Sequence, residues 1–183
     1  MNWPYELGAS LSALQNGFDA VVRQFQRPLA QYLHRYVSQR EAAIDLTQET
    51  FVKAYQNLHR YDSARPFSTW IFSIASNLAK DRLRKITRAA EVPYSELDDF
   101  GEAPRFQRPD RQLDASELGQ ALEAAIGALP LLYREPLVLR HTAGLSVEQT
   151  AEVLGTTAGV VKTRLFRARA RLQEALGKEW LPQ

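Results

Sequence analysis

The sequence predicts an all-α protein with two small helical domains, an N-terminal helical bundle and a C-terminal helix-turn-helix domain, joined by an acidic extended linker. Three observations lead to this prediction. Apolar residues recur every third or fourth position in several segments, and no strand-like alternation of useful length occurs. Two helical patterns near the end of the chain are separated by only a tight turn. Between the two halves, the stretch PYSELDDFGEAPRFQRPDRQLD holds three prolines and one glycine and loses the helical period.

The net charge changes sign along the chain and supports this division. Residues 77–90 and 156–178 are basic, whereas residues 91–117 are acidic. Two basic blocks on either side of an acidic joint are typical of two modules that bind a polyanion. We therefore expect an N-terminal extension over residues 1–16, an N-terminal domain over residues 17–92, a linker over residues 93–114 and a C-terminal domain over residues 115–178.

The composition argues against several classes of protein. With 45% hydrophobic and 24% charged residues among 183, the chain resembles an ordinary globular protein. No apolar run is long enough to cross a bilayer, and the first residues lack the parts of an export signal, so we expect a cytoplasmic protein without membrane insertion. The chain has no cysteine and only three widely spaced histidines. We therefore expect no metal site and no cofactor.

The first helical pattern covers residues 18–37. Pro28 interrupts it, and the pattern does not decide whether this proline kinks or breaks the helix. Seven apolar or aromatic positions share one face and are expected in the core, namely Phe18, Val21, Val22, Phe25, Leu29, Leu33 and Tyr36.

The second pattern covers residues 42–61 and divides into two faces. The predicted core face holds Ile44, Thr47, Phe51, Ala54, Tyr55 and Leu58. The open face holds Asp45, Gln48, Glu49, Val52 and Lys53. An apolar side chain among carboxylates and amides is typical of a protein docking surface, although a solvated face with an isolated valine fits this pattern equally well.

The third pattern covers residues 66–85. Its expected core positions are Phe67, Ile71, Ile74, Ala75 and Leu78. A neighbouring face combines an aromatic ring, short polar side chains and cations, namely Trp70, Ser73, Asn77, Lys80, Asp81, Arg84 and Lys85. Such a surface suits unpaired nucleic acid, because rings stack on bases and cations hold the backbone. A tryptophan taken alone is more often a half-buried packing residue.

After the linker, a further amphipathic stripe ends at Pro130, and a shorter helix, which Pro136 interrupts, closes at Gly144. Ser146 and Gln149 then have the spacing of a capping box that opens a new short helix. Gly155 supplies a left-handed exit from that helix. The expected core positions of this part are Leu118, Leu122, Ala125, Ile126, Leu129, Val147, Ala151 and Leu154.

The last helix follows within a few residues and completes a predicted helix-turn-helix unit. Four apolar positions form its buried edge, namely Val161, Leu165, Ala168 and Leu172. Outward residues near its start can reach base edges while flanking cations lie near phosphates. The expected DNA-binding residues are Thr157, Gly159, Lys162, Thr163, Arg164, Phe166, Arg167 and Arg169. An ordinary amphipathic helix with a basic solvent face is the alternative.

Three stretches, DLTQETFVKAY, FSTWIFSIASNLAKDRLRK and LSVEQTAEVLGTTAGVVKTRLFRARARL, resemble in this order the motifs of bacterial RNA polymerase sigma factors of the extracytoplasmic-function (ECF) class. The resemblance covers about residues 17–176. It implies that Asp45, Gln48 and Glu49 dock on the clamp helices of core RNA polymerase. It also implies that the helix with Trp70 opens the minus-ten element of promoter DNA, that the helix-turn-helix reads the minus-thirty-five element, and that an anti-sigma factor is a partner.

The chain departs from the family pattern at two places. Ile44 stands where a second acid is expected, and Gly159, Val160 and Val161 replace the more usual Gly-Thr-Val order. Two rival functions are a free-standing helix-turn-helix regulator that acts without polymerase, and a small hydrolase that uses Asp45, Glu49 or the histidines. No nucleophile, base and orienting group converge in the sequence, so we expect no enzymatic activity.

Overall fold

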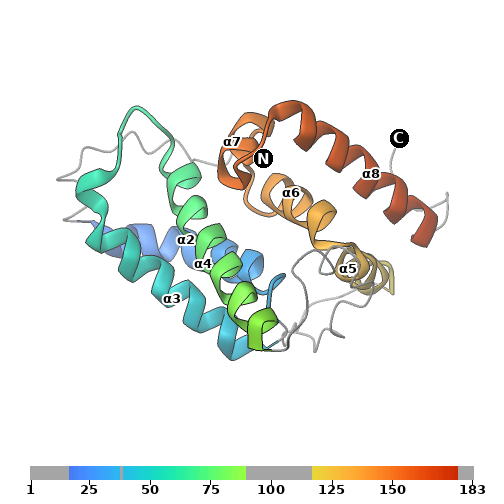
Figure 1. Cartoon of the computed structure of the whole chain (residues 1–183), viewed down its shortest axis with the longest axis horizontal. Helices are drawn as coiled ribbons and strands as arrows, with labels where there is room; N and C mark the ends of the chain where they lie inside the picture. Colours follow the sequence, from blue (N-terminus) through green and yellow to red (C-terminus); the bar gives the residue numbers. More distant parts are fainter. Residues whose placement is uncertain (1–16, 38, 90–116, 177–183) are drawn as a thin grey trace.

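The computed structural model describes residues 17–37, 39–89 and 117–176 (Figure 1). These residues form helices and loops without any strand, so the predicted all-α class is confirmed. The expected extension over residues 1–16 and linker over residues 93–114 lie outside the described residues. The elements are α2 (Phe18–Leu33), α3 (Arg40–Gln56), the short 3-10 helix η1 (Leu58–Arg60), α4 (Phe67–Ala89), α5 (Glu117–Ala128), α6 (Leu131–His141), α7 (Val147–Leu154) and α8 (Ala158–Leu176).

The helices α2, α3 and α4 pack against one another, and we call residues 17–89 the N-terminal unit. The predicted core face of α2 is confirmed, because Val21, Phe25, Leu29, Leu33 and Tyr36 are buried and the two remaining positions are partly buried against them. The helix runs unbroken through Pro28, whose side chain is also buried.

The predicted core face of α3 was wrong at Ile44 and Tyr55, whose side chains are 42% and 56% exposed. The helix is rotated so that its buried line consists of Ala43, Leu46, Thr47, Thr50, Phe51 and Ala54. The two threonines can be buried there because each hydroxyl donates to the carbonyl four residues earlier, at 2.7 Å.

The helices α5, α6 and α7 pack around α8, and we call residues 117–176 the C-terminal unit. All four predicted edge positions of α8 are buried in a core of its own. Ile126 and Ala125 pack against this core, whereas the side chain of Leu118 lies outside the described part. Pro136 lies inside α6, which starts directly after Pro130 and continues through it.

The predicted turn between α7 and α8 is confirmed in atomic detail. The hydroxyl of Ser146 accepts a hydrogen bond from the Gln149 amide at 3.1 Å, and the Gln149 side chain accepts one from the Ser146 amide at 2.6 Å. Gly155 ends α7 with a φ of 66°. The hydroxyl of Thr157 then accepts from the amide of Val160 at 3.3 Å, which caps α8.

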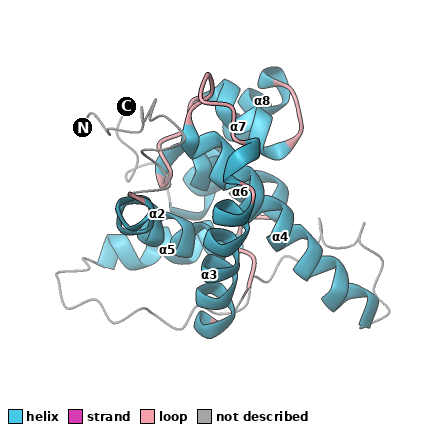
Figure 2. Ribbon diagram, turned by 90° about the vertical axis from the view of Figure 1, so that its left-hand side faces the viewer, coloured by secondary structure: helices cyan, strands magenta, loops and turns pink. Residues whose placement is uncertain are grey.

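The two units are not separate bodies joined only by a linker, because α4 packs against α7 and α2 against α6 (Figure 2). Five apolar residues of the C-terminal unit enter the core of the N-terminal unit: Val138, Leu139, Ala143, Leu145 and Val153. We call this contact the inter-unit interface. Within the described ranges, no helix combines the length and hydropathy needed to cross a membrane.

Candidate nucleic-acid interface

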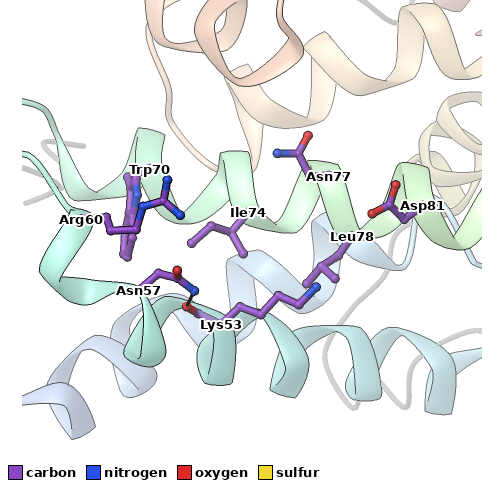
Figure 3. Close-up of a pocket in the computed structure, with 8 residues that line it drawn as sticks. All are labelled: Lys53, Asn57, Arg60, Trp70, Ile74, Asn77, Leu78 and Asp81. Atoms are coloured by element: carbon purple, nitrogen blue, oxygen red, sulfur yellow. Dashed lines mark hydrogen bonds between the residues drawn. The ribbon is translucent and has the colours of Figure 1, made fainter.

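A cavity of about 390 Å³ lies between α3 and α4, and we call it the α3–α4 pocket (Figure 3). The helix α4 contributes an aromatic ring, an amide, a carboxylate and two aliphatic side chains. Two cations and a second amide enter from α3 and the turn that follows it. The lining residues are Lys53, Asn57, Arg60, Trp70, Ile74, Asn77, Leu78 and Asp81.

Trp70 is held in place by two other rings. Its centroid lies 5.3 Å from that of Tyr61 and 5.4 Å from that of Phe67, both in tilted arrangements. Tyr61 is itself fixed, because its hydroxyl donates to the carbonyl of Arg65 at 2.6 Å. Trp70 is therefore a half-buried packing residue that also forms a wall of the pocket.

The polar groups of the pocket are partly ordered by neighbouring contacts. The amide of Asn57 donates to the carbonyl of Lys53 at 2.8 Å, and the Lys53 ammonium lies 3.3 Å from a carboxylate oxygen of Glu49. Asp81 pairs with Arg84 at 3.0 Å, which offsets its negative charge. A ring, an apolar floor, two amides and two cations can together hold a flat heterocycle that carries a phosphate.

The structure brings only part of the predicted minus-ten set into this pocket. Trp70, Asn77 and Asp81 line it, whereas Ser73, Lys80, Arg84 and Lys85 lie elsewhere on α4. The hydroxyl of Ser73 donates to the carbonyl of Thr69 at 2.8 Å and so serves the helix itself.

Three pocket residues were assigned differently or missed by the sequence analysis. Lys53 was placed on the docking face with Asp45, yet it lines the pocket. Asn57 and Arg60 were assigned to neither face of the pattern predicted over residues 42–61; because α3 ends at Gln56, helical periodicity did not predict where these two side chains lie. The 3-10 turn η1 places Arg60 beside the pocket.

The exposed face of α3 is a second candidate surface, which we call the α3 face. Asp45, Gln48, Glu49 and Val52 are exposed as predicted. Ile44 and Tyr55 are also exposed and lie on the same face of the helix. Ile44 is four residues before Gln48, and Tyr55 is three residues after Val52. The ring of Tyr55 packs edge-on against Phe18 at 5.1 Å. The result is an apolar strip with carboxylates along one side.

The outer face of α8 is the third surface. Phe166 is 74% exposed, the most exposed of the large apolar side chains described. Gly159, Lys162, Thr163, Arg167 and Arg169 are exposed as well, and Arg164 is half-buried. These residues show the predicted combination of an outward apolar group with flanking cations.

Tyr133 and His141 interact with arginines of α8. Arg171 lies over the ring of Tyr133 at 5.2 Å from the centroid, so its guanidinium also serves the packing of the C-terminal unit. Burial lowers the pKa of His141, and the positive charge of Arg169 and Arg140 lowers it further.

At Gly159 an added Cβ would meet only the Thr157 hydroxyl, at 3.9 Å. The fold itself therefore does not require glycine there.

The segments of the chain that carry these surfaces match two known protein families. Residues 21–89 match Sigma-70 region 2, and residues 119–172 match Sigma-70 region 4. The chain is 32% identical over 173 residues to the ECF RNA polymerase sigma factor SigW of Bacillus subtilis, covering 88% of this chain and 90% of the relative. The chain belongs to the ECF sigma factor family. The RNA polymerase sigma-H factor of Pseudomonas aeruginosa is also 32% identical, over 88% of this sigma factor and 87% of its own length.

Solved structures of sigma factors resemble this sigma factor over most of its length. The sigma factor RpoE of Bartonella quintana, in complex with the anti-sigma factor NepR, superposes with a TM-score of 0.66 at 26% identity, covering 87% of this chain and 96% of that one. CnrH, in complex with the cytosolic domain of CnrY, gives a TM-score of 0.62 at 28% identity and covers 92% and 93%. The family resemblance that the three motifs indicated is confirmed.

Proposed function

We propose that this sigma factor binds core RNA polymerase, directs it to specific promoters and helps to open the DNA, and that it catalyses no covalent reaction itself. One observation supports this function above the others. A pocket suited to an unpaired base and a basic helix-turn-helix suited to a duplex occur in one chain, beside an exposed docking face. A free-standing regulator needs only the helix-turn-helix.

The α3–α4 pocket is the proposed site for an unpaired base of the minus-ten element. Its volume falls within the range of about 300–1,000 Å³ that is common for small-molecule sites. Trp70 offers a ring for stacking, Asn77 offers an amide for a base edge, and Lys53 and Arg60 offer charge to the backbone. Capture of a base offsets the cost of unpairing, about a few kcal/mol. Arg84 and Lys85 extend the cationic surface along α4.

The α8 helix is the proposed reader of the minus-thirty-five element. Its first two turns expose Thr157, Gly159 and Thr163, where a helix start meets base edges in the major groove. Phe166 can contact a thymine methyl group, and Arg167 can donate to guanine. The remaining cations, Lys162, Arg164 and Arg169, are proposed to hold phosphates.

The α3 face is the proposed contact with core RNA polymerase. It joins Asp45, Gln48 and Glu49 to an apolar strip of Ile44, Val52 and Tyr55. An apolar centre with a charged margin is the usual composition of a protein interface. We assign Lys53 to the proposed DNA site instead, because it lines the α3–α4 pocket.

We also propose the domain boundaries of the chain and one further protein partner. The boundaries of the four expected parts, 1–16, 17–92, 93–114 and 115–178, remain proposed. An anti-sigma factor is a proposed partner, since the two similar sigma factors were solved in complex with NepR, an anti-sigma factor, and with CnrY. A cytoplasmic location follows from a function on chromosomal DNA.

The test is transcription by core RNA polymerase from a promoter library, with and without this sigma factor. We expect transcripts from a defined subset of sequences. The matched variant is Asn77→Ala, which should lower open-complex formation on the same promoters while leaving polymerase binding intact. A protein that produces no specific transcripts, but alone protects a palindromic duplex, would instead be a free-standing regulator.

A further inference from the structure

One flank of α8 carries Lys162 and Arg169. These residues are seven positions apart, so they lie on nearly the same side of the helix, about 10 Å apart along its axis. The helices α6 and α7 both pack against α8 (Figure 1). The pKa of Glu148 on α7 is lowered by hydrogen bonds from its own amide and from Ser146, and also by the charge of Lys162. The charge of Arg169 acts on His141, the last residue of α6. This flank therefore faces the end of α6 and the start of α7.

Arg140, in the last turn of α6, adds a further cation to this flank. Its guanidinium donates to the carbonyl of Leu145 in the turn between α6 and α7, which fixes the direction of the side chain. The charge of Arg140 acts on both Glu148 and His141. The four basic residues form what we call the α6–α8 cluster: Arg140, which is half-buried, and His141, Lys162 and Arg169, which are exposed.

The α6–α8 cluster carries more positive charge than its protein neighbours balance. Glu148 interacts with Lys162 and Arg140, and it also accepts a hydrogen bond from the Ser146 hydroxyl at 3.1 Å. Among the described residues, the charges that act on His141 are those of Arg169 and Arg140, both positive. Like charges held close together repel one another unless an anion lies between them. The cluster therefore favours an anion that comes from outside the chain.

The other charged groups around α6 and α7 are engaged away from His141. At the start of α6, Arg134 and Glu135 contact Arg35 and Tyr36 of the N-terminal unit, and Arg171 of α8 lies over the ring of Tyr133. Glu135 precedes His141 by six residues, which is about 9 Å along the helix. On α7, Glu152 pairs with Arg65 at 2.6 Å. The titration of His141 is therefore governed by the α6–α8 cluster and by its neighbour Glu148.

His141 differs from the rest of the cluster because the charge of an imidazole can change near neutral pH. The buried part of the side chain lowers the pKa of His141 from its ordinary value of 6.5, and the charges of Arg169 and Arg140 lower it further. The imidazole is therefore neutral at pH values near 7 in the free protein. A phosphate bound at the cluster would act in the opposite direction, because a nearby anion favours the charged imidazolium.

The end of α6 does not need these cations for its own stability. Basic residues in a last turn can offset the partial negative charge of a helix C-terminus. Here the last carbonyls already have backbone donors, since the amide of Thr142 donates to Val138 at 2.7 Å and the amide of Leu145 donates to Leu139 at 3.1 Å. A neutral imidazole also adds little to such a role.

We propose that the α6–α8 cluster binds a backbone phosphate of the minus-thirty-five duplex, and that His141 takes up a proton when this phosphate binds. This inference rests on the proposed function of α8 and extends its DNA site to the end of α6. Duplex DNA supplies one negative charge per about 1.7 Å of its axis, so a duplex on the outer face of α8 brings phosphates to both flanks. Binding should therefore strengthen as the pH falls from above 7 toward the pKa of His141 in the free protein, and level off below it.

The test uses the full chain and a short duplex selected from a randomised minus-thirty-five library. Titration calorimetry at about pH 6.5, in two buffers of different ionisation enthalpy, measures the number of protons taken up on binding. Fluorescence anisotropy at constant salt, between about pH 5 and 8, measures the affinity. His141→Gln removes the titrating group, and His141→Lys fixes a positive charge there. The matched control is His59→Gln, which removes an exposed histidine of η1 in the N-terminal unit.

We expect the original protein to take up a fraction of a proton on binding, and its affinity to rise by about tenfold for each pKa unit by which the duplex raises the pKa of His141. His141→Gln should bind more weakly at low pH, with a smaller proton uptake and a flatter pH profile. His141→Lys should bind at high pH as tightly as the original protein binds at low pH. His59→Gln should behave as the original protein does.

Two results overturn the inference and leave the proposed function intact. One is sequence-selective binding without proton uptake by the original protein, and the other is proton uptake by His141→Gln equal to that of the original protein. A protein that selects no sequence from the library at any pH instead overturns the proposed role of α8, and the inference with it.

Discussion

Lys53 of α3 and Trp70 of α4 line the same pocket, although the end of α3, the turn η1 and a loop separate them in the chain. Lys53 is also paired with its neighbour Glu49 at 3.3 Å. We therefore propose that this part of α3 has two partners, with the carboxylates toward polymerase and the Lys53 ammonium toward DNA.

Replacement of Lys53 separates these roles. In Lys53→Ala, we expect unchanged affinity for core polymerase, weaker binding of a forked minus-ten DNA, and a salt slope reduced by about 1 because one phosphate contact is lost. Binding to core polymerase and to fork DNA across a salt series measures both. Asp45→Ala is the matched control and should show the reverse pattern. Weaker polymerase binding by Lys53→Ala with normal fork binding would return Lys53 to the α3 face.

The exposure of Ile44 leads to a prediction that the sequence pattern did not allow. Ile44→Ser should cost little thermal stability, because the residue is 42% exposed and lies outside the core, and should weaken polymerase binding by loss of apolar contact area. Leu46→Ala, two residues away but buried, should instead destabilise the fold by about 2–5 kcal/mol. Thermal unfolding and a polymerase pull-down distinguish the two. A large drop in stability for Ile44→Ser would contradict its position on the surface.

Substitution of Phe166 and substitution of Lys162 should have different effects on DNA binding. Phe166→Ala is expected to keep the stability of α8, since the ring is exposed, and to relax the base preference at one position. Lys162→Ala should weaken binding to all sequences by a similar factor. Selection from a randomised minus-thirty-five library measures both effects. If Phe166→Ala leaves base preference unchanged, the ring does not read DNA.

The two glycines of the helix-turn-helix should respond oppositely to alanine. Gly155 has a φ of 66°, so Gly155→Ala should cost about 1–2 kcal/mol of stability through backbone strain alone, because nothing lies near the added Cβ. Gly159→Ala should stabilise α8 by roughly 0.5–1 kcal/mol but hinder close approach to DNA. Thermal unfolding and binding of a minus-thirty-five duplex provide the comparison. Equal stability of the two variants would contradict this account.

The sequence determined most of the C-terminal unit, because its signals are strong and local. Large apolar residues at strict helical spacing marked the buried edge of α8, and Ser146, Gln149 and Gly155 specify caps whose geometry depends on a few neighbouring residues. The same approach failed at Ile44 and Tyr55. The buried line of α3 includes two alanines and two threonines, whose small size gives a weak periodic signal, so Ile44 and Tyr55 were misplaced.

By itself, the sequence established an all-α chain with three ordered motifs, two basic blocks and an acidic joint, since helix period, capping and charge are properties of short segments. Only the tertiary structure decided which residues meet across elements. It brought Arg60 and Lys53 to Trp70, and it joined Tyr36 to Glu135 across the two units. Such contacts between elements depend on the rotation and packing of whole helices, and residue spacing within one helix does not encode these.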